Sequence, residues 1–224
     1  LGHLAVLATA HARRTADEVM REDVASCVDA PAAPTRTASL YDDAVVPKTF
    51  ASEAIAIVGM SGRYPGAEDL DAFWNRLADG VDCVTEVPPD RWATDRYDVA
   101  CRWLGVVDDI DAFDPLYFGI SPAEAELMDP QHRLFLQEAA RAFDDAGCRP
   151  ADLGGARCGV YLGIMGNEYG QIILRHGVTA DSTGNSGAIA AARIAYLLDL
   201  KGPAIAIDTA CSSSLVATHL ACQA

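Results

Sequence analysis

A cysteine stands at a junction between a predicted strand and a predicted helix near the end of the chain. Residues 204–208 form an apolar run typical of a buried strand, and residues 215–220 return to helical spacing after a turn of small residues. Cys211 therefore lies beside a helix N-terminus, where unpaired backbone N–H groups and the helix dipole favour an anion. A thiolate here would be a nucleophile, and the Cys211 N–H would supply one oxyanion-hole donor. The spacing alone leaves an inert buried thiol as an alternative.

The other cysteines show no metal-binding or redox spacing. The chain has seven cysteines, and no two of them lie at the two-residue gap that zinc ribbons and dithiol redox centres require. The odd number indicates a reducing compartment, and we expect the remaining thiols to lie in the core or on the surface. Cys158 fits a strand interior, and Cys222 fits the last helix.

The five histidines are predicted to have structural or solvent-exposed roles. His132 is expected on a helix surface and His176 in a glycine-flanked loop. His219 falls two turns into the last helix, from which it could approach a substrate channel. His3 and His11 belong to an expected N-terminal helix.

Composition excludes several classes of protein. The chain has 224 residues, half of them apolar and 22% charged, which excludes a disordered tail and a disulfide-stabilised miniprotein. Its net charge of −15 repels polyphosphate and anionic lipid, so we expect neither a nucleic-acid nor a membrane partner. No apolar stretch approaches the roughly 18 residues of a membrane span, and a cytoplasmic protein is expected. Four aspartates between positions 108 and 114 lack the spacing of a calcium loop and favour a solvated face.

Three regions follow from the distribution of apolar and helix-breaking residues. Residues 1–29 are expected to be the helical tail of a preceding domain or a linker helix, with helical character from residue 4 to about 24. Residues 30–52 are rich in proline and small residues and are expected to be a flexible linker. Residues 53–224 are the globular part, which begins with an apolar run at 53–59 typical of a strand buried on both faces.

The globular part alternates predicted strands and helices. Strands are predicted at 157–163 and 204–208, with a helix at 188–200 between them. Further helices carry start or stop signals, either an N-capping residue or a terminating glycine: Asp69, Ser121, Asp129 and Gly147. This alternation predicts an α/β domain with a largely parallel sheet.

Several segments in collinear order carry a family resemblance, beginning with the string around the cysteine. That string is Asp208-Thr209-Ala210-Cys211-Ser212-Ser213-Ser214-Leu215. The others are Ile55-Ala56-Ile57-Val58-Gly59-Met60-Ser61-Gly62-Arg63-Tyr64-Pro65-Gly66, Phe113-Asp114-Pro115-Leu116-Tyr117-Phe118-Gly119-Ile120-Ser121-Pro122, Glu126-Leu127-Met128-Asp129-Pro130-Gln131 and Thr183-Gly184-Asn185. Together they resemble the β-ketoacyl synthase family, specifically the ketosynthase domains of modular polyketide synthases. The resemblance covers residues 53–224 and implies that Cys211 is the acyl-accepting nucleophile.

The resemblance implies a thiolase-like α/β fold, in which two similar halves build α-β-α-β-α layers, and mainly the N-terminal half is expected here. It implies a β-ketoacyl synthase that works in two stages. Cys211 would first take an acyl chain, as a thioester, from the 4′-phosphopantetheine arm of an acyl carrier protein. A malonyl-type extender would then lose carbon dioxide, and its enolate would attack the thioester in a decarboxylative Claisen condensation. No cofactor or metal bound by the chain is implied, and the expected partners are acyl carrier protein domains and a second copy in a homodimer.

The family also carries two histidines that this sequence does not show. One lies in a His-Gly-Thr-Gly-Thr motif downstream of the cysteine and one before the end of the domain, and both assist the decarboxylation stage. The sequence ends thirteen residues after Cys211, so a truncated, catalytically incomplete fragment that is not an enzyme as given is the alternative expectation. Thiolase-type condensation without decarboxylation is a third, weaker option. The sequence also departs from the family in a shorter segment between Arg96 and Trp103 and in Ala192, where asparagine is usual.

Overall fold

The computed structural model of the chain describes residues 6–7, 55–92, 98–166, 168–179 and 182–224. Its contacts group residues Leu1–Ala10 with Ile57–Ala224 as one unit and separate them from a second unit, His11–Ala56. All described residues except Ile55 and Ala56 belong to the first unit. The expected linker at 30–52 and the expected N-terminal helix beyond residue 7 lie outside the described residues.

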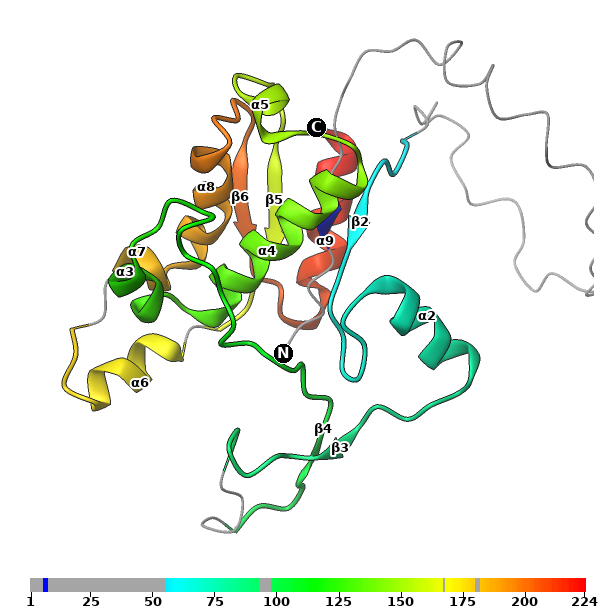
Figure 1. The fold of residues 1–224 in the computed structure, drawn as a ribbon, viewed down its shortest axis with the longest axis vertical. Coiled ribbons are helices and arrows are strands. Elements are labelled where there is room, and N and C mark those ends of the chain that lie inside the picture. Colours follow the sequence, from blue (N-terminus) through cyan, green and yellow to red (C-terminus); the bar gives the residue numbers. More distant parts are fainter. Residues whose placement is uncertain (1–5, 8–54, 93–97, 167, 180–181) are drawn as a thin grey trace, which may run out of the picture. The chain divides into compact units, whose positions relative to one another are not determined.

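A pair of parallel strands forms the centre of the first unit (Figure 1). β5 (Val160–Gly163) pairs with β6 (Ala204–Ile207), and the register runs from Val160 opposite Ala204 to Gly163 opposite Ile207. Both strands lie within the segments predicted from the sequence, and their parallel pairing confirms the α/β prediction. The connection between them contains helix α8 (Gly187–Leu197), since parallel neighbours need a long crossover connection that is usually helical.

Helices cover both faces of this pair of strands. The buried side chains of alternate β5 residues, Val160 and Leu162, belong to a core shared with α4 (Pro130–Asp145) and α8. Gly163 faces the opposite way and abuts α9 (Ser213–Gln223). Strand alternation therefore gives a layer of helices, the strands, and a second helix layer made by α9.

The remaining elements are short. They are the helices α2 (Leu70–Ala78), α3 (Pro122–Leu127), α5 (Pro150–Leu153), α6 (Tyr169–Arg175) and α7 (Ser182–Asn185), the 3₁₀ turn η2 (Ala210–Ser212), and the strands β1 (Val6–Leu7), β2 (Met60–Ser61), β3 (Thr85–Glu86) and β4 (Trp103–Leu104). β1 pairs antiparallel with β2, and β3 with β4. None of the helices in the described ranges is long and apolar enough to cross a bilayer.

The predicted helix starts are confirmed by their capping hydrogen bonds. The Asp69 carboxylate accepts a hydrogen bond from the Ala72 N–H at 2.7 Å, and the Ser121 hydroxyl accepts one from Glu124 N–H at 3.2 Å. Asp129 accepts one from Gln131 N–H at 2.8 Å, and α4 ends just before Gly147, whose φ is 68°. These short-range signals could be predicted because each involves only residues close in sequence.

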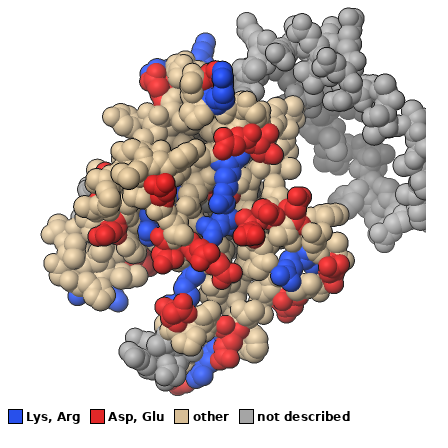
Figure 2. All heavy atoms as spheres, viewed as in Figure 1, with Lys and Arg blue, Asp and Glu red and all other residues tan. Residues whose placement is uncertain are grey.

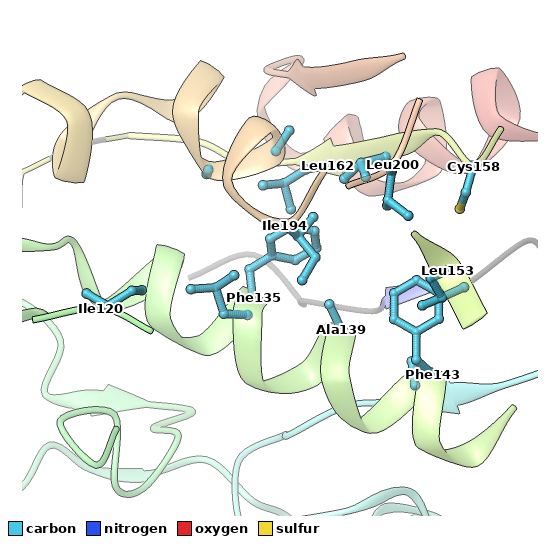
Figure 3. Packing of buried hydrophobic residues seen from close by; sticks show 14 of the residues in the cluster. Ile120, Phe135, Ala139, Phe143, Leu153, Cys158, Leu162, Ile194 and Leu200 are labelled. Atoms are coloured by element: carbon cyan, nitrogen blue, oxygen red, sulfur yellow. The ribbon is translucent and has the colours of Figure 1, made fainter. Parts of the chain in front are cut away.

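The hydrophobic core lies between α4, α8 and β5 (Figure 3). Its central members are nine-tenths or more buried, and those labelled in the figure are Ile120, Phe135, Ala139, Phe143, Leu153, Cys158, Leu162, Ile194 and Leu200. Ala142 on α4 and Ala191 on α8 are completely buried members of this core. The core therefore covers the face of β5 that points away from α9.

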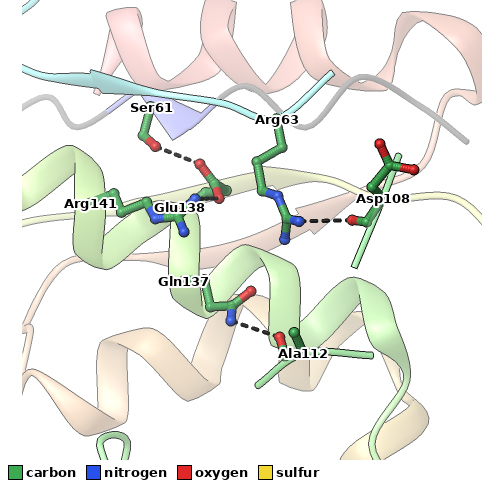
Figure 4. A network of polar contacts seen from close by, with 7 residues as sticks. All are labelled: Ser61, Arg63, Asp108, Ala112, Gln137, Glu138 and Arg141. Carbon is green, nitrogen blue, oxygen red and sulfur yellow. Dashed lines mark hydrogen bonds and ion pairs between the residues drawn. The ribbon is translucent and has the colours of Figure 1, made fainter. Parts of the chain in front are cut away.

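A polar network holds residues 60–61 onto α4 (Figure 4). The Ser61 hydroxyl donates to Glu138 Oε2 at 2.5 Å, and Arg141 Nη1 donates to Glu138 Oε1 at 2.8 Å. The Met60 N–H donates to the Asp145 carboxylate at 2.8 Å. Glu138 is buried, and a buried carboxyl group is costly unless it has hydrogen-bond partners, which Ser61 and Arg141 supply.

Two expectations about the N-terminal part are wrong. The strand predicted at 53–59 is not formed over residues 55–59, whose Ile57 is 56% exposed, and β2 follows it at Met60 and Ser61. Val6 and Leu7 form a strand instead of part of a helix. An apolar run forms a buried strand only where neighbouring strands pair with it, and among the described residues only these two pair with β2.

Candidate active site

Cys211 lies just beyond the carboxyl end of β6, between the strand and α9. It is the central residue of η2, and its side chain is exposed. The predicted strand-to-helix turn is therefore confirmed, and the alternative of a buried thiol is wrong. Reactive groups in α/β folds lie at the carboxyl ends of parallel strands, and Cys211 occupies such a position.

The turn that carries Cys211 has an unfavourable backbone conformation. Ala210 has φ of 55°, a left-handed conformation that costs a residue with a Cβ about 1–3 kcal/mol. The Asp208 carboxylate accepts a hydrogen bond from the Ala210 N–H at 3.0 Å, which helps the chain to reverse direction directly after β6. A conformation of this kind persists only where the surroundings hold it.

The hydroxyl of Ser213 stabilises this conformation through two hydrogen bonds to the backbone. It accepts a hydrogen bond from the Thr209 N–H at 2.9 Å and donates one to the Ala210 carbonyl at 2.7 Å. These two partners bracket the strained residue, and Ser213 itself is only 5% exposed. The sequence could not show which of three successive serines has this role, because that depends on which one faces β5.

A glycine at the end of β5 lets α9 come close to the sheet. A Cβ added to Gly163 would lie 2.6 Å from Ser214 N and 2.7 Å from the Ser213 carbonyl carbon. Real Cβ atoms do not approach backbone atoms so closely, so only glycine allows this packing. Gly163 thereby sets the position of the helix that begins two residues after Cys211, and sequence analysis missed it.

The N-terminus of α9 presents backbone donors near Cys211. The Ser212 side chain, at the N-cap, makes no hydrogen bond to the first turn and instead donates to Thr209 O at 2.9 Å. The helix is eleven residues long, so its dipole favours negative charge at this end. The turn is therefore suited to stabilising an oxyanion formed beside Cys211.

The prediction for His132 is wrong. The side chain was expected on a helix surface but is 2% exposed, and its Nδ1 makes no hydrogen bond in the described structure. Burial, and then the positive charge of Arg193, lowers the pKa of His132 from 6.5 to about 4. The sequence pattern did not predict this burial because α4 packs against β2 as well as α8. Residues outside the main apolar face of α4 are therefore buried too. His132 is a neutral core residue.

The remaining candidates are separate from the Cys211 turn. His176 caps the C-terminus of α6, and His219 is on α9; both side chains are exposed. Cys158 was predicted in a strand interior but lies two residues before β5, so that placement is wrong. Its side chain is buried, and burial, with a smaller contribution from Cys148, raises the pKa of its thiol. Cys222 is exposed on α9.

The aspartates and other potential ligands form no metal centre in the described ranges. No group of three or more histidine, cysteine, aspartate or glutamate side chains there could hold a metal ion. The four aspartates of residues 108–114 are exposed, and Asp114 accepts hydrogen bonds from the N–H groups of Leu116 and Tyr117. On the face drawn in Figure 2, acidic side chains surround a narrow line of basic ones, with no broad basic field.

The Thr183-Gly184-Asn185 segment is held at the junction of α3 and α4. Asn185 Nδ2 donates to Leu127 O at 2.8 Å, and the Asp129 N–H donates to Gly184 O at 2.9 Å. Arg193 on α8 pairs with Glu124 at 2.6 Å. The segment thus connects the helix that follows it to the capped start of α4.

Comparison with protein families gives a match over most of the chain. Residues 52–224 match the family model described as "Beta-ketoacyl synthase, N-terminal domain". Polyketide synthase PksL of Bacillus subtilis is 57% identical over 181 residues, covering 77% of this chain and 4% of the relative. Polyketide synthase ThaG of Burkholderia thailandensis is 45% identical over 191 residues, covering 80% of this chain and 3% of the relative. The chain therefore spans only a small part of these relatives.

Solved structures give the same match. A ketosynthase from module 6 of the bacillaene synthase of Bacillus subtilis superposes with a TM-score of 0.70 at 57% identity, covering 76% of this chain and 29% of the solved chain. The oxazolomycin ketosynthase domain OzmH KS7 of Streptomyces albus gives a TM-score of 0.66 at 43% identity, covering 74% of this chain and 31% of the solved chain. These neighbours have the thiolase-like fold, which confirms that expectation.

Proposed function

Because the chain belongs to the β-ketoacyl synthase family, as the N-terminal portion of a ketosynthase domain of the modular polyketide synthase type, we propose that Cys211 is its acyl-accepting nucleophile. One observation carries this proposal. Cys211 is exposed at a strained strand-to-helix turn, directly before a helix N-terminus that favours negative charge. No other cysteine in the described ranges stands at the N-terminus of a helix of comparable length.

The first stage is transfer of an acyl chain to the thiol. The Cys211 thiolate attacks the carbonyl carbon of an acyl thioester carried on the 4′-phosphopantetheine arm of an acyl carrier protein. A tetrahedral oxyanion forms, and the Cys211 N–H is placed to donate to it. The carbon–sulfur bond to phosphopantetheine then breaks, the departing thiolate takes up a proton, and an acyl-Cys211 thioester remains.

The second stage is condensation with a malonyl-type extender on a carrier protein. Loss of carbon dioxide leaves an enolate, whose carbon attacks the acyl-Cys211 carbonyl and displaces the Cys211 thiolate. The product is a β-ketoacyl thioester. The described histidines are unsuited to stabilising that enolate. His132 is buried, and neither His176 nor His219 lies in a His-Gly-Thr-Gly-Thr sequence like that of the family. We therefore assign residues 1–224 the nucleophile and propose that they do not complete the condensation by themselves.

The proposed partners are acyl carrier protein domains and a second copy of the chain. With a net charge of −15, binding an acidic carrier protein requires a local patch of arginines. The β6 strand pairs on one side only within the described ranges, and its Ile205 is exposed. An exposed strand edge of this kind is suited to pairing with the same strand of a second copy.

The proposal is tested by product formation in a longer protein that contains residues 1–224 within a complete ketosynthase domain (the full-length protein). Incubation with an acyl-pantetheine thioester and a malonyl-loaded carrier protein should give a β-ketoacyl carrier protein, detected by its mass. Cys211→Ala should abolish this product, whereas Cys222→Ala, an exposed thiol on the same helix, should leave it at the wild-type level. Product formed at the wild-type rate by Cys211→Ala would overturn the proposal.

A further inference from the structure

The Ser213 hydroxyl occupies an unusual position relative to the Cys211 turn. Its oxygen accepts from the Thr209 N–H at 2.9 Å and donates to the Ala210 carbonyl at 2.7 Å, so it joins the two ends of the Thr209–Ala210 dipeptide. Between those two ends lies the left-handed Ala210, with φ of 55°. The residue that follows the bracketed pair is Cys211. The hydroxyl therefore holds the part of the backbone that determines where the thiol points.

The packing of α9 on β5 fixes Ser213 itself. Ser213 is buried, and the absent side chain of Gly163 allows the Ser213–Ser214 backbone to lie directly on the end of β5. β5 is in turn held by its pairing with β6, the strand that leads into the turn. The turn is thus held from two directions: along the chain from β6, and through Ser213 from β5.

We propose that Ser213 is a positioning residue for Cys211, which holds the thiol and the Cys211 N–H in the geometry that acyl transfer requires. The inference rests on the proposed function of Cys211 and extends it to a residue that does not touch the substrate. Acyl transfer needs the sulfur and an oxyanion donor at fixed positions relative to one carbonyl group, and small displacements of such groups reduce rates strongly. Alkylation by a small reagent needs only an accessible thiol. The two reactions should therefore respond differently when the hydroxyl is removed.

The chain offers a matched control next to Ser213. Ser213→Ala removes both bracketing hydrogen bonds and leaves the Gly163 contact, which involves backbone atoms only. Ser214→Ala is the same chemical change one residue later, in a hydroxyl that makes none of the hydrogen bonds holding the turn. Any difference between the two variants is therefore due to the two bracketing hydrogen bonds of Ser213 (the bracket) and not to the loss of a serine from α9.

The experiment follows the peptide that contains Cys211 by mass spectrometry in the full-length protein. Each variant is treated with an acyl-N-acetylcysteamine thioester in one series and with iodoacetamide in another, and hydrogen exchange of α4 and α9 peptides is measured in parallel. We expect Ser213→Ala to acylate at least about tenfold more slowly than wild type. Its alkylation should stay within about threefold, α4 should keep its protection, and Ser214→Ala should match wild type in all three measurements.

Two results would overturn the positioning role. One is acylation of Ser213→Ala at the wild-type rate. The other is a parallel loss of acylation, alkylation and α4 protection, which would make the hydroxyl a requirement for folding only. Failure of the proposed function gives a different result: wild type itself would not acylate at Cys211. In that case the bracket is judged by exchange alone, where faster exchange of residues 209–216 in Ser213→Ala than in Ser214→Ala supports it and equal exchange contradicts it.

Discussion

Acid should loosen α4 through a single buried histidine. His132 lies in the core with Nδ1 unpartnered, faces the positive Arg193 of α8, and has its pKa lowered from 6.5 to about 4. The folded state therefore binds this proton less readily than the unfolded state, so stability is complete above pH 6.5 and is lost as pH falls toward 4. Between pH 7 and pH 5 the two pKa values correspond to a loss of about 2 kcal/mol, or roughly a twenty-fold rise in the opening equilibrium of α4.

Hydrogen exchange of α4 peptides in the full-length protein measures this opening, once the intrinsic pH dependence of exchange is removed. His132→Gln should abolish most of the twenty-fold rise, while His176→Gln, at an exposed histidine, should retain it. Burial raises the pKa of Asp129, which has the opposite effect on the pH dependence, but this contribution is common to wild type and variants and cancels in the comparison. An equal rise in wild type and His132→Gln would refute the reasoning.

Two further substitutions test how the site is supported. Gly163→Ala would place a Cβ 2.6 Å from Ser214 N and should destabilise the packing of α9 by about 1–3 kcal/mol, seen as faster exchange of α9 peptides. Gly154→Ala, where an added Cβ meets no atom within 4 Å and φ is −56°, is the neutral control, and equal effects of the two would contradict the packing argument. Glu138→Gln should weaken the hydrogen bonds to Ser61 and Arg141 by about 1–3 kcal/mol. Hydrogen exchange at residues 60–61 should then become faster. Unchanged hydrogen exchange there would show that the network does not hold β2.

Local signals in the sequence predicted the parts of the fold that depend on neighbouring residues. Asp69, Ser121 and Asp129 cap helices as expected, because a cap is completed within three residues. The apolar run at 53–59 predicts a strand that does not form over residues 55–59, because strand formation depends on a partner distant in sequence. The burial of His132 was missed for a related reason: which faces of α4 are covered depends on β2 and α8 together.

In the candidate site, too, local features could be predicted from the sequence and tertiary ones could not. The turn that presents Cys211 could be predicted from an apolar run, a stretch of small residues and a return to helical spacing. The roles of Ser213 and Gly163 could not, because one depends on which of three serines faces inward and the other on the distance between α9 and the end of β5. Tertiary contacts between segments about fifty residues apart determine both.

The central claim is that an acyl group is carried on Cys211, and peptide mapping tests it most directly. The full-length protein is incubated with an acyl-N-acetylcysteamine thioester, digested, and sequenced by tandem mass spectrometry. The proposed function predicts that the added acyl mass is localised to Cys211 and is released by hydroxylamine, as expected for a thioester. Acyl mass found on other residues, with Cys211 unmodified, would contradict it.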